Sequence, residues 1–318
     1  MAVFIPKIAS RLASILILFA FIAIDTFAQQ DEKTTPDEVA VNANDESKPV
    51  SDTKQIAAPT PKSLTQQHKE DLAHYLPEKQ VKPLLAGPDD YITLVTESTH
   101  FNNKGVAILL PDWQQGATNP KAINFLRNRL PQEGWTTLSV QPENIPQNYP
   151  STALTKSEQQ EENNIIIDEY KTKLGSMMNA VIEKANDYPG IVIIFAQGNN
   201  GAMLVDLLNE NDEGAVLTQT PNALILLSSY LLTNDKLIDS INTDFATKLS
   251  YSEYPVLDLY LMHDNPIVLD KAKERLSLAK KEMKVYYRQR QLINSAMGYY
   301  PEEELISQLN GWLKSIGW

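Results

Sequence analysis

Residues 191–201 read Ile-Val-Ile-Ile-Phe-Ala-Gln-Gly-Asn-Asn-Gly, an apolar run followed at once by a turn rich in glycine and asparagine. The first five of these residues are all β-branched or aromatic, which is typical of a central parallel strand buried on both faces. Gly198 and Gly201 permit a tight turn, and we expect a helix to follow it through Asn209. The stretch therefore predicts a strand–turn–helix unit of an α/β sheet, in which ligands bind where the strands end.

Strands and helices alternate on both sides of this unit, which predicts a doubly wound, mostly parallel sheet. In residues 157–187 the apolar residues recur three or four positions apart, as they do along one face of a long helix. Residues 91–97 alternate and residues 105–110 are apolar throughout, so we expect an outer strand paired with a more buried one. Further strands are expected at 135–140, 223–228, 256–261 and 285–292, and further helices at 120–132, 235–248, 266–281 and 301–318.

The beginning of the chain has the features of an export signal. Lys7 and Arg11 precede an apolar run from Ser14 to Ile24, and Ala28 supplies a small residue for cleavage. An uncleaved anchor is the alternative, but the run is short against the roughly 20 apolar residues that span a bilayer. No later segment is long and apolar enough to span, so we expect a mature protein without a transmembrane segment.

The rest of the N-terminal region predicts a linker and a short helix before the main domain. The linker is rich in acidic and small polar residues, and its few apolar side chains cannot offset the entropy lost on ordering. A helix is expected at 63–75, followed by a connection over 76–88. The expected segments are a signal peptide at 1–28, a disordered linker at 29–62, a helical appendage at 63–87 and an α/β domain at 88–318.

The composition excludes several kinds of chemistry and partner. The chain has no cysteine, so it forms no disulfide, thiolate metal site or cysteine nucleophile. Its net charge is −12, which argues against nucleic acid or anionic lipid as a main partner. No set of His, Asp and Glu residues falls at a ligand spacing such as His-Glu-x-x-His, so we expect no metal and no other cofactor.

Four short segments of the sequence resemble those of a known protein family. They are Gly-Val-Ala-Ile-Leu-Leu-Pro-Asp-Trp at 105–113, Glu-Gly-Trp-Thr-Thr-Leu at 133–138, Tyr-Tyr-Arg-Gln at 286–289 and Gly-Trp-Leu at 311–313. With them the chain resembles an uncharacterised family of exported bacterial proteins with an α/β-hydrolase-like fold. The resemblance covers most of residues 85–318, and it implies that fold and a periplasmic location but no known activity.

In α/β-hydrolases the turn after the central strand is Gly-x-Ser-x-Gly, and its serine is the nucleophile. If residues 196–200 are superposed on that turn, Gly198 takes the place of the serine, so no oxygen stands there to attack a carbonyl. The turn itself would still form, because glycine and asparagine tolerate positive φ. The alternative is that Gly198 and Gly201 only permit close packing of the strand against the helix.

The other catalytic groups of an α/β-hydrolase are a carboxylate after a late strand and a histidine after the last one. Asp264 lies in a suitable place, but residues 293–300 contain no histidine. His263 adjoins Asp264, and in an extended segment the two side chains would point to opposite sides, which disfavours an acid/base site centred on His263. Ser228 and Ser229, at the end of another expected strand, are further nucleophile candidates without a predicted base, and a turn or cap is their alternative role.

A binding site at these strand ends stays compatible with the sequence. The backbone amides at the start of the helix would face the crevice, where an anion or a carbonyl oxygen binds favourably. The stretches 112–114 and 198–201 in the two expected loops carry no Lys or Arg. A small neutral ligand such as a glycan or peptide fragment therefore fits better than a polyphosphate. The expected ligand-binding residues are Asp112, Trp113, Gln197, Gly198, Asn199, Asn200 and Gly201.

Three functions are compatible with this pattern. The leading hypothesis is a periplasmic α/β-hydrolase-like protein without an intact Ser-His-Asp triad, which binds a small ligand or a protein partner. The second is a hydrolase of the esterase or amidase type with a displaced catalytic group drawn from Ser228, Asp264 and His263. The third is a cell-envelope scaffold with the linker as a tether. Its contact surface would be aromatic, although the same residues are also expected on the core face of the last helix: Tyr299, Tyr300, Trp312 and Trp318.

Overall fold

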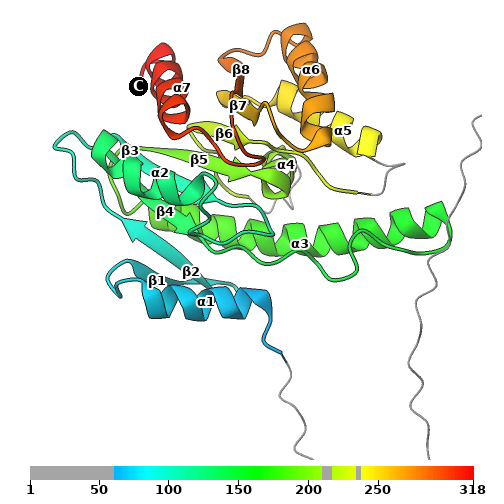
Figure 1. Cartoon of the computed structure of the whole chain (residues 1–318), viewed down its shortest axis with the longest axis horizontal. Helices are drawn as coiled ribbons and strands as arrows, with labels where there is room; N and C mark the ends of the chain where they lie inside the picture. Colours follow the sequence, from blue (N-terminus) through cyan, green and yellow to red (C-terminus); the bar gives the residue numbers. More distant parts are fainter. Residues whose placement is uncertain (1–60, 210–216, 234–237) are drawn as a thin grey trace, which may run out of the picture. The chain divides into compact units, whose positions relative to one another are not determined.

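The computed structural model describes residues 61–209, 217–233 and 238–318 (Figure 1). The expected signal peptide and nearly all of the expected linker lie outside the described residues. The chain divides into the units Met1–Ala58 and Pro59–Trp318, and every described residue belongs to the second. In this part of the chain no helix combines the length and the apolar character that crossing a bilayer requires.

An eight-stranded sheet forms the centre of this unit, in the order β1-β2-β4-β3-β5-β6-β7-β8 (Figure 1). The β1–β2 and β2–β4 pairs are antiparallel, and all other neighbouring strands are parallel. The expectation of a mostly parallel, doubly wound sheet is therefore confirmed. The strands are β1 (Val81–Ala86), β2 (Asp89–Thr96), β3 (Gly105–Leu110), β4 (Trp135–Val140), β5 (Ile191–Gln197), β6 (Ala223–Leu227), β7 (Val256–Leu261) and β8 (Tyr287–Leu292).

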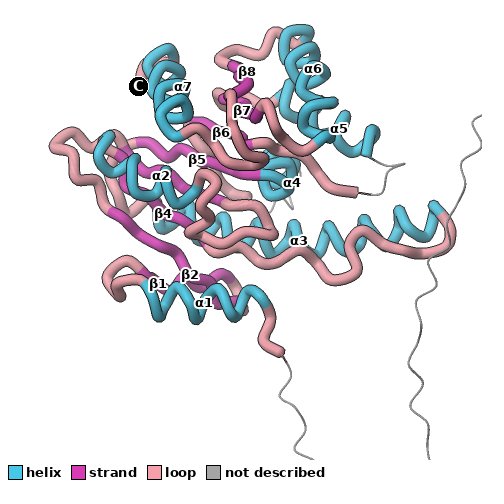
Figure 2. The backbone as a smooth tube through the Cα atoms, viewed as in Figure 1, coloured by secondary structure: helices cyan, strands magenta, loops and turns pink. Residues whose placement is uncertain are grey.

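Helices cover both faces of the sheet (Figure 2). Ile193 and Phe195 of β5 pack in one core cluster with residues of α2 and α7, whereas Ile194 and Ala196 pack in a second cluster with residues of α3, α4 and α5. This split follows from the alternation of side chains along a strand. The helices are α1 (Leu64–Tyr75), α2 (Ile123–Arg129), α3 (Lys156–Ala185), α4 (Gly198–Leu208), α5 (Ile238–Tyr251), α6 (Pro266–Lys281) and α7 (Glu302–Ser315), and a 3-10 turn, η1 (Leu130–Glu133), follows α2.

Two details of the N-terminal part differ from expectation. The segment expected to be a connection contains β1, which pairs with β2 and forms one edge of the sheet. The sequence did not predict this strand because it contains Pro83. Proline argues against a strand except at positions such as an edge, and β1 is an edge strand. In addition, β2 pairs with β1 and β4 and not with β3, since β4 lies between β2 and β3.

Helix α1 packs onto the sheet near its antiparallel edge. Its N-cap, Ser63, accepts a hydrogen bond from the backbone N–H of Gln66 at 3.2 Å, which fixes the start of the helix. Leu72 of α1 forms a small buried cluster with Leu94 of β2 and with Ala117 in the loop after β3. The helix therefore lies beside the loop that leaves the carboxyl end of β3.

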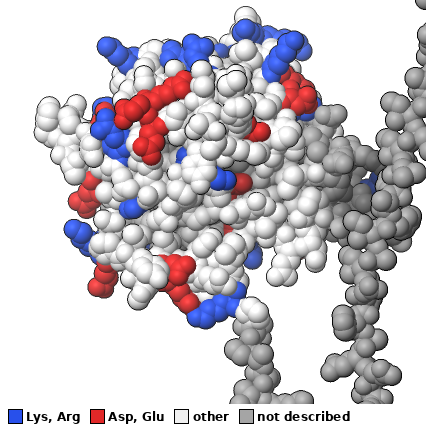
Figure 3. Space-filling model, in the orientation of Figure 1, with Lys and Arg blue, Asp and Glu red and all other residues white. Residues whose placement is uncertain are grey.

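The charged side chains of the surface and the aromatic residues in and around the last helix are the features that could contact a partner. Basic and acidic side chains are interspersed on the face shown in Figure 3 and form no broad area of one sign. Of the aromatic residues expected either as a contact or as core, Tyr300 and Trp312 are buried, while Tyr299 and Trp318 are partly exposed. The aromatic residues are thus divided between the core and the surface and form no single exposed patch.

Candidate functional site

The turn between β5 and α4 has the conformation of a nucleophile elbow with glycine at its tip. Gln197 is extended, with φ −109° and ψ 143°, and Gly198 has φ +57°. Positive φ is the region that glycine enters without strain. A Cβ atom at position 198 would lie only 2.5 Å from Cγ of Asp112. Glycine is therefore required at this position both by the backbone and by the side chain that lies against it.

The Asp112 carboxylate occupies the space beside the elbow. Its Oδ1 atom accepts hydrogen bonds from the backbone N–H of Asn199 at 2.9 Å and of Trp113 at 3.0 Å, and from Nδ2 of Asn199 at 3.2 Å. Burial raises the pKa of Asp112, and the hydrogen bonds from Asn199 and Trp113 oppose that rise. The start of α4 is a favourable place for a negative group. Here the chain's own carboxylate fills it.

The remaining predicted binding residues mostly hold the elbow together. Trp113 is buried and meets the rings of Tyr149 and Tyr170 edge-on at 5.5 Å. Asn200 is also buried, and its Nδ2 atom donates to the backbone oxygen of Pro111 at 2.7 Å. Gly201 lies against Ser229, because an added Cβ would come within 2.1 Å of the serine hydroxyl. None of these three predicted residues lines the cleft that opens beside the elbow.

A cleft of about 280 Å³ opens where β3, β5, β6 and β7 end. Three of the seven predicted binding residues line it, namely Asp112, Gln197 and Gly198. Ser228 and Asp264 line it as well, so the structure brings two of the three catalytic candidates to the same space as the elbow. The rest of the lining is Gln114, Gln115, Lys121, Tyr230, Asn265, Met297, Gly298 and Tyr300.

Ser228, Asp264 and Tyr300 form a hydrogen-bonded group in this cleft. The Ser228 hydroxyl donates to Oδ2 of Asp264 at 2.5 Å, and the Tyr300 hydroxyl lies 2.6 Å from the same serine oxygen. Because the single serine hydrogen goes to the carboxylate, Tyr300 is the donor in the second bond. Burial and the charge of Asp264 raise the pKa of Tyr300 well above its ordinary value, which keeps the phenol protonated.

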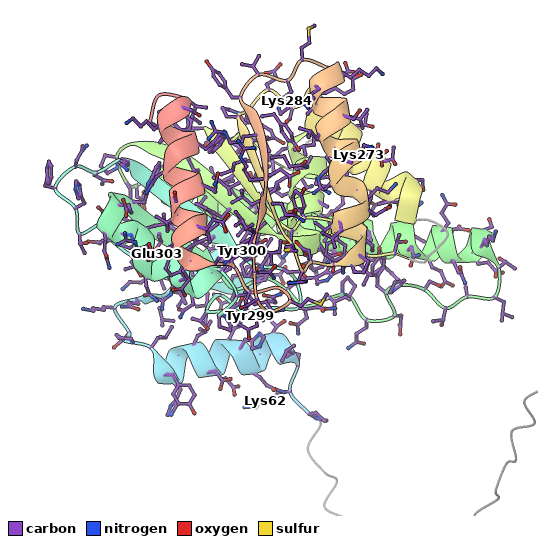
Figure 4. The ribbon with its side chains drawn as sticks, turned by 45° about the horizontal axis from the view of Figure 1, so that its top comes forward. Lys62, Lys273, Lys284, Tyr299, Tyr300 and Glu303 are labelled. Carbon is purple, nitrogen blue, oxygen red and sulfur yellow. The ribbon has the colours of Figure 1, made fainter. Side chains whose placement is uncertain are left out.

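The backbone holds each member of this group in place. Ser228 has φ +50°, an uncommon value for serine, directly after β6. The Asp264 carboxylate also accepts hydrogen bonds from the backbone N–H of Leu261 at 2.8 Å and of Asn265 at 2.7 Å. Tyr300 donates its backbone N–H to the carbonyl of Lys121 at 3.0 Å, and it lies in the segment just before α7 (Figure 4).

His263 does not join this group. Its side chain is exposed, and its hydrogen bonds are made by its backbone, to Oδ1 of Asn294 at 2.8 Å and from Nδ2 of Asn294 at 3.1 Å. Tyr300 instead reaches Ser228 from the loop after β8, the loop in which a hydrolase carries its histidine. Sequence reasoning missed this tyrosine as a site residue, although its place after the last strand was a usable signal.

The cleft also contains a cation that the sequence did not predict. Lys121 lines it from the β3–α2 loop, the same loop that carries Asp112, so the expectation that the loops at the site carry no Lys or Arg is wrong. Among the described residues no group of three or more His, Asp or Glu side chains is placed to hold a metal ion. The arrangement supplies hydroxyl, amide and carboxylate groups, which bind polar ligands by hydrogen bonds.

Comparison with known proteins identifies the family. The profile of a family described as "Protein of unknown function (DUF3530)" matches residues 10–315, nearly the whole chain. The chain belongs to the DUF3530 family. None of the curated proteins matches it. The resemblance to an uncharacterised family with an α/β-hydrolase-like fold is thereby confirmed for this DUF3530 protein.

Solved structures similar to this DUF3530 protein include α/β-hydrolase esterases. A thermophilic esterase, Est2, from Thermogutta terrifontis matches with a TM-score of 0.54 and 11% identity, over 76% of this chain and 95% of the esterase. Its propionate-bound form matches with a TM-score of 0.53, also at 11% identity, over 76% of this chain and 96% of the esterase. TT1662 from Thermus thermophilus matches with a TM-score of 0.50 and 14% identity, over 73% of this chain and 98% of that protein. At these identities the likeness establishes the fold alone.

Proposed function

We propose that this DUF3530 protein is a periplasmic, non-catalytic relative of the α/β-hydrolases whose strand-end cleft binds a small polar ligand. The observation that carries the proposal is the position of the Asp112 carboxylate. It lies where the side chain of a nucleophile at position 198 would have to stand, and it accepts the hydrogen bonds that the start of α4 offers. An acyl-transfer site needs that space for a nucleophile and for an oxyanion.

The lining of the cleft favours a ligand with several hydrogen-bonding groups. Gln114, Gln115, Gln197, Tyr230 and Asn265 present neutral amide and hydroxyl groups around the Ser228–Asp264–Tyr300 group. Among the lining residues the charged side chains are those of Asp112, Lys121 and Asp264, and Asp112 is buried. A glycan or peptide fragment has donors and acceptors of this kind, and the exposed Met297 offers apolar contact at the rim.

The binding proposal predicts that loss of the Tyr300 hydroxyl weakens a ligand without unfolding the protein. We expect Tyr300→Phe to weaken binding by about 3–10-fold, the usual effect of removing one hydrogen bond of roughly 0.5–1.5 kcal/mol. The measurement is a calorimetric titration of the purified protein with short N-acetylglucosamine oligomers and with alanine tripeptides.

Tyr299→Phe is the matched control for this titration, because Tyr299 is the neighbouring residue and does not line the cleft. It should bind as the wild type does. The proposal fails if neither kind of probe binds the wild type, or if the two tyrosine variants lose affinity equally.

A displaced hydrolase is a second candidate, because one observation favours it. Ser228 stands after a central strand with positive φ and donates a 2.5 Å hydrogen bond to Asp264. An activated serine requires a base to accept its proton. The Asp264 carboxylate is in place for this, whereas the exposed His263 would reach Ser228 only after a rearrangement. This candidate would be abandoned if a Ser228→Ala/His263→Ala/Asp264→Ala variant kept all hydrolytic activity of the wild type.

The proposed location is supported by the N-terminal sequence. A basic start, an apolar run and Ala28 before Gln29 are the features of a cleaved signal peptide. We expect the protein expressed in a bacterium with two membranes to be recovered in the periplasmic fraction with Gln29 as its first residue. Recovery of uncleaved protein in the membrane fraction would contradict this and favour an anchor.

A further inference from the structure

A second, larger groove adjoins the cleft and contains a buried arginine. The groove has a volume of about 690 Å³ and lies between α1 and the segment that leads from β3 into α2. Gln114, Gln115 and Lys121 line both the groove and the cleft, so the two spaces meet at these side chains. His68 and Arg127 line only the groove. A volume of this size is in the range of small-molecule sites.

Among the described residues, the partners of the Arg127 guanidinium are neutral hydrogen-bond acceptors, and none carries an opposing charge. It is only 6% exposed. Its Nη1 atom donates to Oε1 of Gln80 at 3.2 Å and its Nη2 atom to Oδ1 of Asn124 at 3.1 Å, while Nε is buried without a partner. In the described part of the chain no carboxylate lies within ion-pair distance of this guanidinium. Each terminal nitrogen carries a second hydrogen beyond the one already used.

A buried cation without a counter-charge is unfavourable, and proteins usually pair such a group. Arg275 provides a contrast within this protein, because it is also buried but donates to the carboxylate of Asp258 at 2.8 Å. Desolvation lowers the pKa of Arg127, in agreement with the absence of a compensating charge. Of the charged groups lining the groove, Arg127 and Lys121 are basic and Asp71 is acidic, so the lining carries a net positive charge.

We propose that this groove is an anion-binding site in which Arg127, helped by Lys121, binds the oxyanion group of a small ligand. The planar guanidinium suits a carboxylate or a phosphate, since both accept two parallel N–H bonds. Neighbouring amides, among them Gln115 with a buried Oε1 atom that lacks a partner, would contact the remainder of the ligand. The proposal concerns the groove alone and stands or falls independently of the cleft.

The proposal predicts saturable stabilisation by a small oxyanion. We expect the midpoint of thermal unfolding to rise with increasing acetate or inorganic phosphate at constant ionic strength, because a ligand that binds only the folded state stabilises it. Chloride and neutral acetamide should have no such effect. A response to acetate alone identifies a carboxylate site, a response to phosphate alone identifies a phosphate site, and a response to neither overturns the proposal.

Two variants assign the effect to the groove. Arg127→Met keeps much of the side-chain volume and removes the unpaired charge, so it should fold and lose the anion response. Arg129→Met is the matched control, because Arg129 lies on the same helix and pairs with Glu133 at 2.9 Å. It should keep the full response. An equal loss of the anion response in both variants would show a general charge effect and contradict the proposal. If Arg127→Met by itself alters the unfolding midpoint, a chemical-shift titration of both variants with the same anions replaces the thermal measurement.

Discussion

Replacement of Asp258 with alanine is expected to lower the free energy of unfolding by about 3–5 kcal/mol, the usual effect of breaking a fully buried ion pair. Asp258 of β7 and Arg275 of α6 are 0% and 1% exposed, and Nε of the arginine lies 2.8 Å from Oδ2 of the aspartate. The same carboxylate oxygen accepts from the hydroxyl of Tyr287 at 2.9 Å and from Nε2 of Gln289 at 2.8 Å. The variant leaves a buried guanidinium without its counter-charge, and urea denaturation measures the loss.

The matched control replaces both partners of this pair. Asp258→Leu combined with Arg275→Met removes both charges and keeps most of the volume, so we expect a much smaller loss than for Asp258→Ala alone. Two outcomes would count against the role assigned to this pair. One is a loss below about 1 kcal/mol in the single variant, the value for an exposed pair, and the other is a double variant that is no more stable than the single one.

Gly198→Ser, which restores the serine of a hydrolase elbow, is expected to destabilise the protein by about 2–5 kcal/mol and to create no activity. Positive φ contributes roughly 1–2 kcal/mol of this, and insertion of a side chain into filled space contributes about 1–3 kcal/mol. The filled space is the Asp112 carboxylate, whose two oxygens would each lie 2.7 Å from the new Cβ atom. Urea denaturation and an ester hydrolysis assay on the same preparation check the two parts.

Two further variants separate the causes of that loss. In Gly198→Ser/Asp112→Ala the overlap is relieved. Asp112→Ala should therefore lower the free energy of unfolding less in the Gly198→Ser protein than in the wild type, and the difference between the two losses should be about 0.5–3 kcal/mol. Gly311→Ser adds the same side chain in α7, where nothing lies within 4 Å of the added Cβ. It should change stability little. If Gly198→Ser is as well tolerated as Gly311→Ser, Asp112 does not restrict position 198.

Most elements of the fold could be predicted because their sequence patterns are local. β3, β4 and β7 occupy the predicted residues, as short apolar or β-branched runs between turn residues indicate. β8 begins two residues later than predicted, at Tyr287, because Tyr286 has φ +59° and cannot extend the strand. The pairing of β2 could not be predicted, since the order of strands depends on contacts between segments far apart in the chain.

The candidate site was predictable only in part, for the same reason. Gly198 and Asp264 follow predicted strands, and the carboxyl ends of parallel strands meet at one edge of the sheet, so their common location followed from the pattern. The hydrogen bond from Tyr300 to Ser228 joins residues in loops whose conformation has no periodic signal. Likewise, only the folded structure brings Asp112 against Gly198, and this contact carries the functional proposal.

A hydrolase assay on the purified protein tests whether the strand-end cleft is non-catalytic. The substrates are short-chain acyl esters and peptide amides, and Ser228→Ala is measured beside the wild type. We expect no saturable turnover in either protein, because Asp112 fills the space at the elbow and no imidazole reaches Ser228 among the described residues. Saturable turnover in the wild type that disappears in Ser228→Ala would show that the protein is a hydrolase centred on Ser228 and not a non-catalytic binding protein.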